Sequence, residues 1–133
     1  MRLSDINADS ILPDLTIDIK LTNSCDATKY DCGPGIINTY EVSLKYNEQT
    51  ISSTTLTTLN GIGYTSDLKT VNQYQGKGFA STLYKKLIDI ARSLNLKELR
   101  SDTNRKEQTS EIWKKIGAEL YNDEHGQVFR LKL

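Results

Sequence analysis

Six consecutive residues, Gln75 to Ala80, carry the clearest chemical signal in the chain. Their sequence, QGKGFA, holds two glycines and opens a stretch with the period of an amphipathic helix. Glycines at the mouth of a helix let the backbone approach a ligand closely, and the first N–H groups of the helix are free to bind an anion. These residues therefore predict an anion-binding turn, with phosphate as its preferred ligand.

The known phosphate-binding patterns differ in the spacing of their glycines. A Walker A loop needs four residues between its first glycine and a Gly-Lys-Ser/Thr, which Gly76-Lys77-Gly78 does not provide. A dinucleotide-binding G-x-G-x-x-G needs a glycine at the position of Ser81. The pattern Q/R-x-x-G-x-G/A does fit, with Gln75, Gly78 and Ala80 in its fixed places. A glycine turn that only begins a helix is the alternative.

This pattern, between a strand and a long helix, resembles the pyrophosphate-binding loop of the GNAT superfamily of acyl-CoA-dependent N-acyltransferases. A second segment, Ser110 to Ala118 (SEIWKKIGA), is similar to the later helix of that family, commonly L-Y-x-K-x-G-F. The resemblance runs from Tyr40 to the end of the chain. Trp113 departs from it, because the family commonly has tyrosine there and an indole N–H is a donor but not an acid.

Composition favours one globular domain over residues 1–133. The chain has 133 residues, of which 37% are hydrophobic, enough for a real core. Its 17 basic and 17 acidic residues balance, so no overall field attracts nucleic acid or a membrane surface. No apolar run approaches the roughly 20 residues of a membrane span, and the first residues lack the plan of a signal peptide. We therefore expect a cytoplasmic protein.

The few cysteines and histidines predict no metal site. Cys25 and Cys32 stand in a polar segment, and the only histidine, His125, is far along the chain, which is too few ligands for structural zinc. In a reducing compartment the two cysteines are expected to be free thiols.

The predicted elements follow from the spacing of apolar residues. Alternation predicts strands at 14–21, 40–46, 51–59, about 64–71, 97–101, 119–121 and 127–133. One helix is predicted from Phe79 to Leu94, and a second opens at the capping pair Asn104 and Glu107 and stops at Gly117. Segment 22–38 is polar and broken by Gly-Pro-Gly, so it predicts a loop.

The order of these elements is four strands, a helix, a strand, a helix and two strands. A helix that joins strands four and five predicts a right-handed crossover in a mixed sheet. The resemblance implies an α/β (α+β) fold of the GNAT type, a mixed and mostly antiparallel sheet with a V-shaped splay between strands four and five. The helical region before the second strand is shortened, because a helix of the usual length does not fit segment 22–38.

The resemblance implies acetyl-CoA as co-substrate and assigns residues to its parts. Main-chain amides of the loop would bind the pyrophosphate, the amide of Gln75 would face the same phosphates, and the main chain of strand four would hold the pantetheine arm. Lys77 is either a phosphate contact or a solvated lysine, and Trp113 either packs against pantetheine or fills the core. The implied cofactor-binding residues are Leu68, Lys69, Thr70, Gln75, Gly76, Lys77, Gly78, Phe79, Ala80 and Trp113.

The chemistry of the family is direct attack of an amine on a thioester, which needs a base and an acid. Asp67 in strand four is the first candidate for the base, and Asp102 after strand five is the second. Glu41 is a third, if its face lines the cleft. With tryptophan at position 113, the thiolate would be protonated by water or by another residue such as Tyr121 or Tyr84. A turn or capping role is the alternative for each aspartate.

Three functions remain open at this point. The first is an N-acetyltransferase whose acceptor is an amine on a small molecule, a peptide or a protein. The second is a non-catalytic CoA-binding module, which Trp113 favours. The third is a protein-interaction module that uses the fold as a scaffold. Segment 22–38 and the turn 122–126 are expected to build the acceptor side. The residues leave open whether edge strands or the carboxy-terminal hairpin pair into a homodimer.

Overall fold

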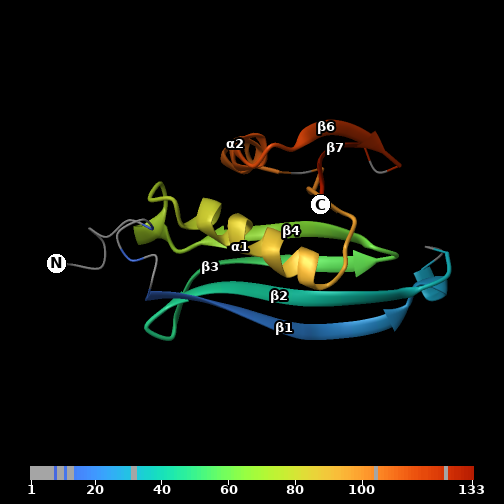
Figure 1. Ribbon diagram of the computed structural model, residues 1–133, viewed down its shortest axis with the longest axis horizontal. Coiled ribbons are helices and arrows are strands. Elements are labelled where there is room, and N and C mark those ends of the chain that lie inside the picture. The colour runs from blue at the N-terminus through green and yellow to red at the C-terminus, as the bar shows by residue number, and fades with distance from the viewer. Residues whose placement is uncertain (1–7, 9–10, 12–13, 31–32, 104, 125) are drawn as a thin grey trace.

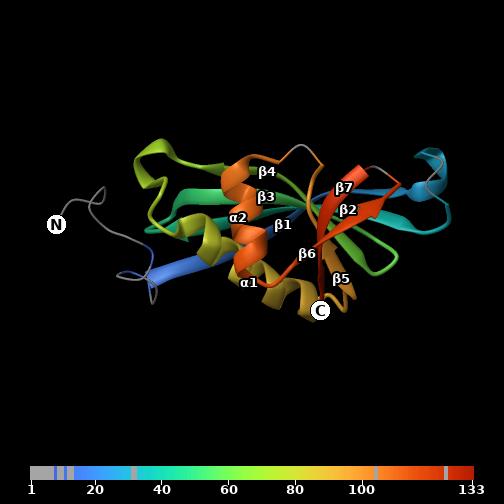
Figure 2. The same ribbon diagram turned by 90° about the horizontal axis from the view of Figure 1, so that it is seen from above.

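The computed structural model describes Ala8, Ile11 and residues 14–30, 33–103, 105–124 and 126–133. One twisted sheet runs through the molecule, and the long helix α1 lies on one of its faces (Figure 1). The carboxy-terminal strands β7 and β6 continue this sheet beyond β5, and with α2 they form the smaller part of the molecule (Figure 2). The elements are β1 (Leu15–Asp26), β2 (Ile36–Tyr46), β3 (Gln49–Leu59), β4 (Ile62–Thr70), α1 (Phe79–Ser93), β5 (Glu98–Arg100), α2 (Glu107–Lys115), β6 (Glu119–Asp123) and β7 (Gly126–Lys132).

The sheet has the strand order β1-β2-β3-β4-β5-β7-β6. All neighbours are antiparallel except β4 and β5, which are parallel and joined through α1. This parallel pairing covers only Ile62–Tyr64 against Glu98–Arg100, after which β4 continues alone to Thr70. The mixed sheet with a splay between strands four and five is therefore confirmed.

The core lies between α1 and the sheet. Fully buried side chains of α1 pack on the apolar positions of the strands; among them are Leu83, Leu87, Val42, Leu44 and Leu56. Gly63 is needed where β4 meets β5, because a Cβ there would lie 2.8 Å from Leu99 and 2.9 Å from Leu96. That close approach lies at the parallel contact between β4 and β5.

The segment before the second strand differs from the predicted loop. β1 continues through Thr22 to Asp26, and β2 already begins at Ile36, so the connection is shorter than residues 22–38. A bulge between Leu21 and Asn23 and a hydrogen bond from Thr22 Oγ1 to the Thr39 carbonyl (3.1 Å) accommodate this extension. Residues 22–26 are exposed on both faces of this edge strand, apart from the partly buried Cys25, so neither face needs apolar side chains and the alternation rule misses them. The described part of the connection holds one 3₁₀ turn, Ala27–Tyr30.

The second helix begins at Glu107, and Lys106 is its N-cap without a side-chain hydrogen bond. The predicted capping residue Asn104 lies outside the described residues, as do Cys32 and His125. Cys25 is a free thiol. Within the described ranges no helix is long and apolar enough to cross a membrane, and no three potential metal ligands come together.

Candidate active site

The glycine loop has the backbone that its sequence predicts. After a 3₁₀ turn at Asn72–Tyr74, Gly76 has φ 73° and Gly78 has φ 86°, in the left-handed region that favours glycine. Gly78 is the N-cap of α1 and provides no side chain to cap the first turn. The first N–H groups of a 15-residue helix thus point outward beside two glycines, which is a favourable place for an anion.

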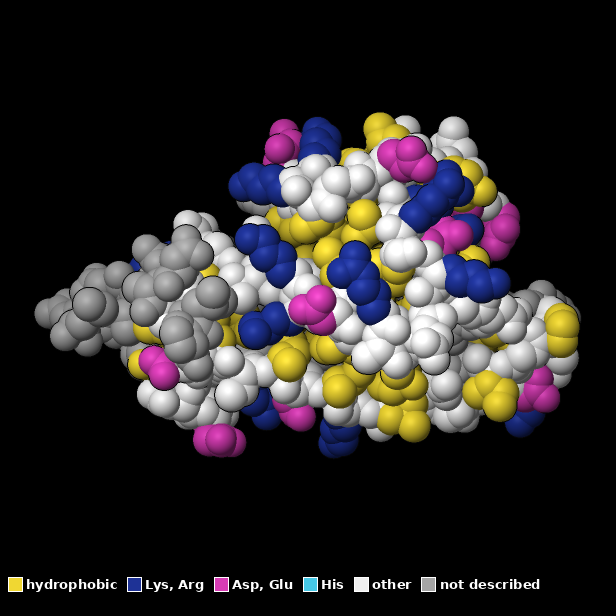
Figure 3. Space-filling model, in the orientation of Figure 1, with side chains coloured by type: hydrophobic (Ala, Val, Ile, Leu, Met, Phe, Trp, Pro, Cys, Tyr) yellow, Lys and Arg dark blue, Asp and Glu magenta, His cyan; other side chains and the backbone are white. Residues whose placement is uncertain are grey.

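A cavity of about 900 Å³ joins this loop to the end of β4 and to α2. Its wall includes most of the predicted cofactor-binding residues, namely Leu68, Lys69, Thr70, Gln75, Gly76, Gly78, Phe79 and Ala80. Lys77 and Trp113 are not part of the wall. Three lysines, Lys69, Lys106 and Lys115, line the cavity with one acid, Glu111, so its charge suits an anionic ligand. Basic side chains lie around this hollow between α2 and the main body (Figure 3).

The α2 side of the cavity was missed by the sequence analysis. Ser81, the N-cap residue Lys106 and the α2 residues Gln108, Thr109, Glu111, Ile112 and Lys115 line it, and none of these was predicted to line a binding site. The amphipathic pattern of α2 was the available signal, because its polar face had to point somewhere other than the core.

The side chain of Gln75 stabilises the start of the glycine loop through two hydrogen bonds. Its Nε2 donates to the Thr70 carbonyl (3.1 Å) and to Asn72 Oδ1 (3.2 Å). These bonds tie the end of β4 to the turn before the glycines, so the side chain helps to position the main-chain amides. A direct contact of this amide with phosphate stays a prediction.

β4 carries a bulge at Asp67 and Leu68. Ser53 of β3 pairs with Lys69 and Thr55 pairs with Ser66, so two residues of β4 face one of β3. Asp67 has φ 53°, a left-handed conformation that aspartate tolerates better than most residues. Bulged residues leave the ladder and expose main-chain groups. The bulge thus offers main-chain groups of β4 at the wall of the cavity.

Asp67 itself lies in a second, shallow hollow of about 200 Å³. Glu41 and Lys69 also line this hollow, and so do threonine and serine residues of β1, β2 and β3. Glu41 belongs to the face of β2 opposite the buried Val42 and Leu44, so this hollow is on the sheet face away from α1. Lys69 lines both hollows, which places the bulge between them.

The other predicted catalytic residues do not line either hollow. Asp102 follows β5, and its carbonyl accepts hydrogen bonds from Ser101 Oγ (3.1 Å) and Arg105 Nη1 (3.2 Å). The ring of Tyr121 in β6 contacts two guanidinium groups, those of Arg100 at 5.2 Å and Arg130 at 3.9 Å from its centre. The structure thus places Asp67 in the second hollow, next in sequence to Leu68 and Lys69 of the cavity wall, whereas Asp102 and Tyr121 line neither hollow.

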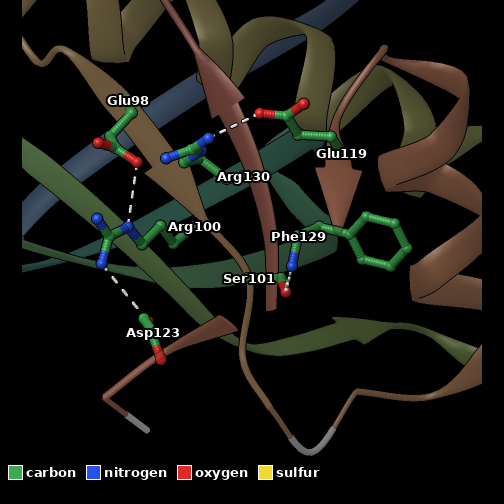
Figure 4. A network of polar contacts seen from close by, with 7 residues as sticks. All are labelled: Glu98, Arg100, Ser101, Glu119, Asp123, Phe129 and Arg130. Carbon is green, nitrogen blue, oxygen red and sulfur yellow. Dashed lines mark hydrogen bonds and ion pairs between the residues drawn. The ribbon is translucent and has the colours of Figure 1, made fainter. Parts of the chain in front are cut away.

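The surroundings of Tyr121 form a network of ion pairs (Figure 4). Arg100 contacts Glu98 (3.1 Å) and Asp123 (3.5 Å), and Arg130 Nη2 contacts Glu119 (2.8 Å). Ser101 Oγ accepts a hydrogen bond from the Phe129 amide (2.7 Å). These contacts tie β5 to β6 and β7, which gives this region a structural role in joining the smaller part to the main sheet.

Trp113 fills the core. Its side chain is 0% exposed and packs on Tyr84 with ring centres 5.4 Å apart. This position agrees with the core-packing alternative, and a contact with pantetheine stays a prediction.

The buried phenol of Tyr84 should make the free energy of unfolding depend on pH in the alkaline range. The side chain is 2% exposed, and burial raises the pKa of its phenol, partly offset by hydrogen bonding with Thr65 and Thr54. A raised pKa in the folded state means that the unfolded chain ionises first. We therefore expect the free energy of unfolding to fall as pH rises beyond about 10, the usual value for tyrosine.

Denaturant unfolding of the Tyr84→Phe variant between pH 8 and 11 measures this effect. Above about pH 10, the free energy of unfolding should fall less steeply with pH in Tyr84→Phe than in the wild type, and this reduction in slope should be larger than in Tyr64→Phe. Burial also raises the pKa of Tyr64, but that side chain is only half-buried and Arg100 opposes the shift. Equal slopes in wild type and Tyr84→Phe would contradict the assignment.

Residues 28–117 match the family model described as the acetyltransferase (GNAT) family. The chain belongs to the GNAT acetyltransferase family. Among curated proteins, none matches it in sequence.

Solved structures of this family share the fold at low sequence identity. The PaiA N-acetyltransferase from Thermoplasma acidophilum in complex with coenzyme A is 13% identical, with a TM-score of 0.62, over 80% of this chain and 65% of that one. A GNAT family acetyltransferase from Elizabethkingia anophelis with acetyl-CoA bound is 14% identical, with a TM-score of 0.62, over 90% of this chain and 99% of that one. This GNAT chain thus spans less than two thirds of the Thermoplasma protein and almost all of the Elizabethkingia protein.

Proposed function

We propose that this GNAT domain transfers an acetyl group from acetyl-CoA to a primary amine of a small molecule, a peptide or a protein by direct attack. One observation carries the proposal: the bulge at Asp67 and Leu68 separates a basic cavity with a glycine loop from a polar hollow on the other face of the sheet. Such an arrangement suits a reaction in which two substrates approach a strand from opposite sides.

The cavity would hold the co-substrate. Main-chain amides at Gly76, Gly78 and the start of α1 would bind the pyrophosphate, and Lys106 and Lys115 add positive charge to the same cavity. The pantetheine arm would run along Leu68 to Thr70, where β4 has no parallel neighbour beyond Tyr64. Support for this ligand also comes from two solved GNAT structures that are described with coenzyme A or acetyl-CoA.

The amine would enter from the hollow that contains Asp67. A neutral amine nitrogen attacks the thioester carbonyl carbon, the C–N bond forms and the C–S bond breaks. The carboxylate of Asp67 would take the proton that the nitrogen loses, directly or through water, and a main-chain amide of the bulge would stabilise the oxyanion. The CoA thiolate then takes up a proton.

The group that protonates the CoA thiolate bears on whether the domain is an enzyme or a non-catalytic CoA-binding module. Tyr121 stays a proposed acid, although its ring is stacked on Arg130. Water suffices if no side chain serves, because a thiolate is a tolerable leaving group. The burial of Trp113, where the family commonly has tyrosine, is the observation that favours a non-catalytic CoA-binding module.

Calorimetric titration of acetyl-CoA, and separately of desulfo-CoA, into the intact chain tests the proposal. We expect saturable binding in the micromolar range for both ligands. Release of CoA thiol is then recorded with polyamines, free amino acids and lysine-containing peptides as acceptors. Binding without thiol release from any of these amines would favour the CoA-binding module. The absence of binding by the folded chain would overturn both readings and favour an interaction protein.

A further inference from the structure

The two edges of the sheet differ in how they are protected. β6, at one edge, has five residues, and its acidic residues Glu119 and Asp123 pair with arginines. β1, at the other edge, has twelve residues and, among the described residues, pairs with β2 alone. Short edge strands resist association, whereas a long edge strand presents a row of N–H and C=O groups to another chain. In β1 the pairing with β2 is regular from Leu15 to Leu21, ahead of the bulge before Asn23. β1 is therefore the edge that is open to a partner.

The side chains of β1 also suit association. Ile17, Ile19 and Leu21 share the face that bears α1, and Ile19 and Leu21 are 39% and 53% exposed. α1 contacts β2, β3, β4 and β5, so the exposed Ile19 and Leu21 lie at the edge beyond the helix, whereas Ile17 is packed against the core. Hydrophobic side chains appear along this lower edge in Figure 3, where Figure 1 places β1 and β2. Apolar residues at an open edge are a feature that monomers usually avoid.

The charges of β1 select a partner and a register. When two copies of an antiparallel edge strand meet across a two-fold axis normal to the sheet, paired residues lie on the same face. In such a pairing Asp18 and Lys20 meet themselves or each other only when the centre is Asp18, Ile19 or Lys20. Centring on Asp18 sets two acids opposite each other, and centring on Lys20 sets two lysines opposite each other. Only the centre at Ile19 sets Asp18 opposite Lys20 of the second copy, twice.

We propose that two copies of this chain associate through β1 in antiparallel register centred on Ile19, which joins their sheets into one. In this register Ile17 lies opposite Leu21 of the second copy, and the apolar rows of both strands meet. Asp18 and Lys20 each have an oppositely charged neighbour on β2: Lys45 Nζ contacts Asp18 (3.4 Å), and Glu41 is paired in register with Lys20. The new ion pairs would continue this alternation of charge into the second copy. Cross-strand pairs of this kind stabilise a sheet and fix its register.

Sedimentation velocity on the wild-type chain and two charge variants tests the proposal. The wild type should sediment with twice the 15.0 kDa mass of the chain. Lys20→Glu sets acids opposite Asp18, and Asp18→Lys sets lysines opposite Lys20, so each variant alone should raise the dimer dissociation constant about tenfold or more. An equimolar mixture of the two should recover the dimer, because every facing pair then has opposite charges.

Leu120→Lys is the matched control. Leu120 is 54% exposed on the other edge strand, β6, so a lysine there should leave the dimer unchanged, whereas Ile19→Lys should weaken it. Circular dichroism checks that each variant is folded, which is expected because Asp18 and Lys20 are exposed. A monomeric wild type at about 100 μM, a dimer that both charge variants leave intact, or a mixture that stays monomeric would each overturn the proposal.

Discussion

Replacing Gly76 by tryptophan is expected to raise the dissociation constant for acetyl-CoA about 100-fold or more, which corresponds to roughly 2.7 kcal/mol or more of binding free energy. Gly76 lines the cavity at the glycine loop, and a Cβ there meets nothing within 4 Å. A side chain can therefore leave the main chain at this position without a contact at its Cβ, and an indole would occupy the place where the pyrophosphate must approach the main chain.

The backbone adds to this effect. Gly76 has φ 73°, and the left-handed region costs a residue with a side chain about 1–2 kcal/mol. Part of the loop would therefore shift or lose stability in the variant, and the amides would no longer converge on one anion. Calorimetric titration of acetyl-CoA into the variant measures the loss.

Gly117→Trp separates the loss of binding from the cost of strain. Gly117 is exposed like Gly76, has φ 90°, and also has nothing within 4 Å of an added Cβ, but it does not line the cavity. Both variants should lose similar stability in denaturant unfolding, while only Gly76→Trp loses acetyl-CoA. Equal affinities in the two variants would move the ligand away from the glycine loop.

The glycine loop was predictable because its information is local. The turn, the positive φ angles and the start of α1 all follow from a few neighbouring residues in QGKGFA, and the helix period continues directly from them. The mixed sheet followed from the order of elements and from the family pattern. Such features depend little on contacts between distant parts of the chain.

The bulge and the extension of β1 were not predictable by the same rules. In β4 the buried residues Gly63 and Thr65 alternate with more exposed ones. Beyond Asp67 the less exposed positions are Leu68 and Thr70, so the alternation shifts by one residue at Asp67. The register of β3 against β4 decides whether such a break is a bulge or the end of a strand. Likewise Thr22 to Asp26 are strand residues because they pair with β2, and their own sequence favours turns.

The side chains of the polar hollow show the same limit. Glu41 and Asp67 are far apart in the sequence and meet because β2, β3 and β4 are neighbours in the sheet. Sequence alone ranked Asp67 first for its place on strand four, and the structure adds that it lies at a bulge. The surroundings of Tyr121 could not be predicted from the sequence, because the arginines that contact its ring come from two other strands, β5 and β7.

Replacing Asp67 by asparagine is expected to lower kcat for acetyl transfer about 100-fold or more and to leave the affinity for acetyl-CoA unchanged. General base catalysis contributes typically 10²–10⁴-fold, and an amide cannot accept the proton that the attacking nitrogen must lose. Asparagine has nearly the same shape and tolerates the left-handed conformation at φ 53°, so the bulge should persist. Release of CoA thiol with the amine that the wild type accepts gives kcat, and calorimetry gives the affinity.

Two further variants make this result specific to Asp67. Glu41→Gln removes the other carboxylate of the same hollow, and Asp102→Asn removes the second candidate, which lies after β5. If Asp67 is the base, Glu41→Gln should change KM for the amine more than kcat, because Glu41 then contributes only charge near the incoming ammonium. Asp102→Asn should change neither kinetic constant strongly. A large loss of kcat in Asp102→Asn, with near-normal turnover in Asp67→Asn, would identify Asp102 in the β5–α2 connection as the general base. The amine would then have to approach the splay between β4 and β5 from the side of β5.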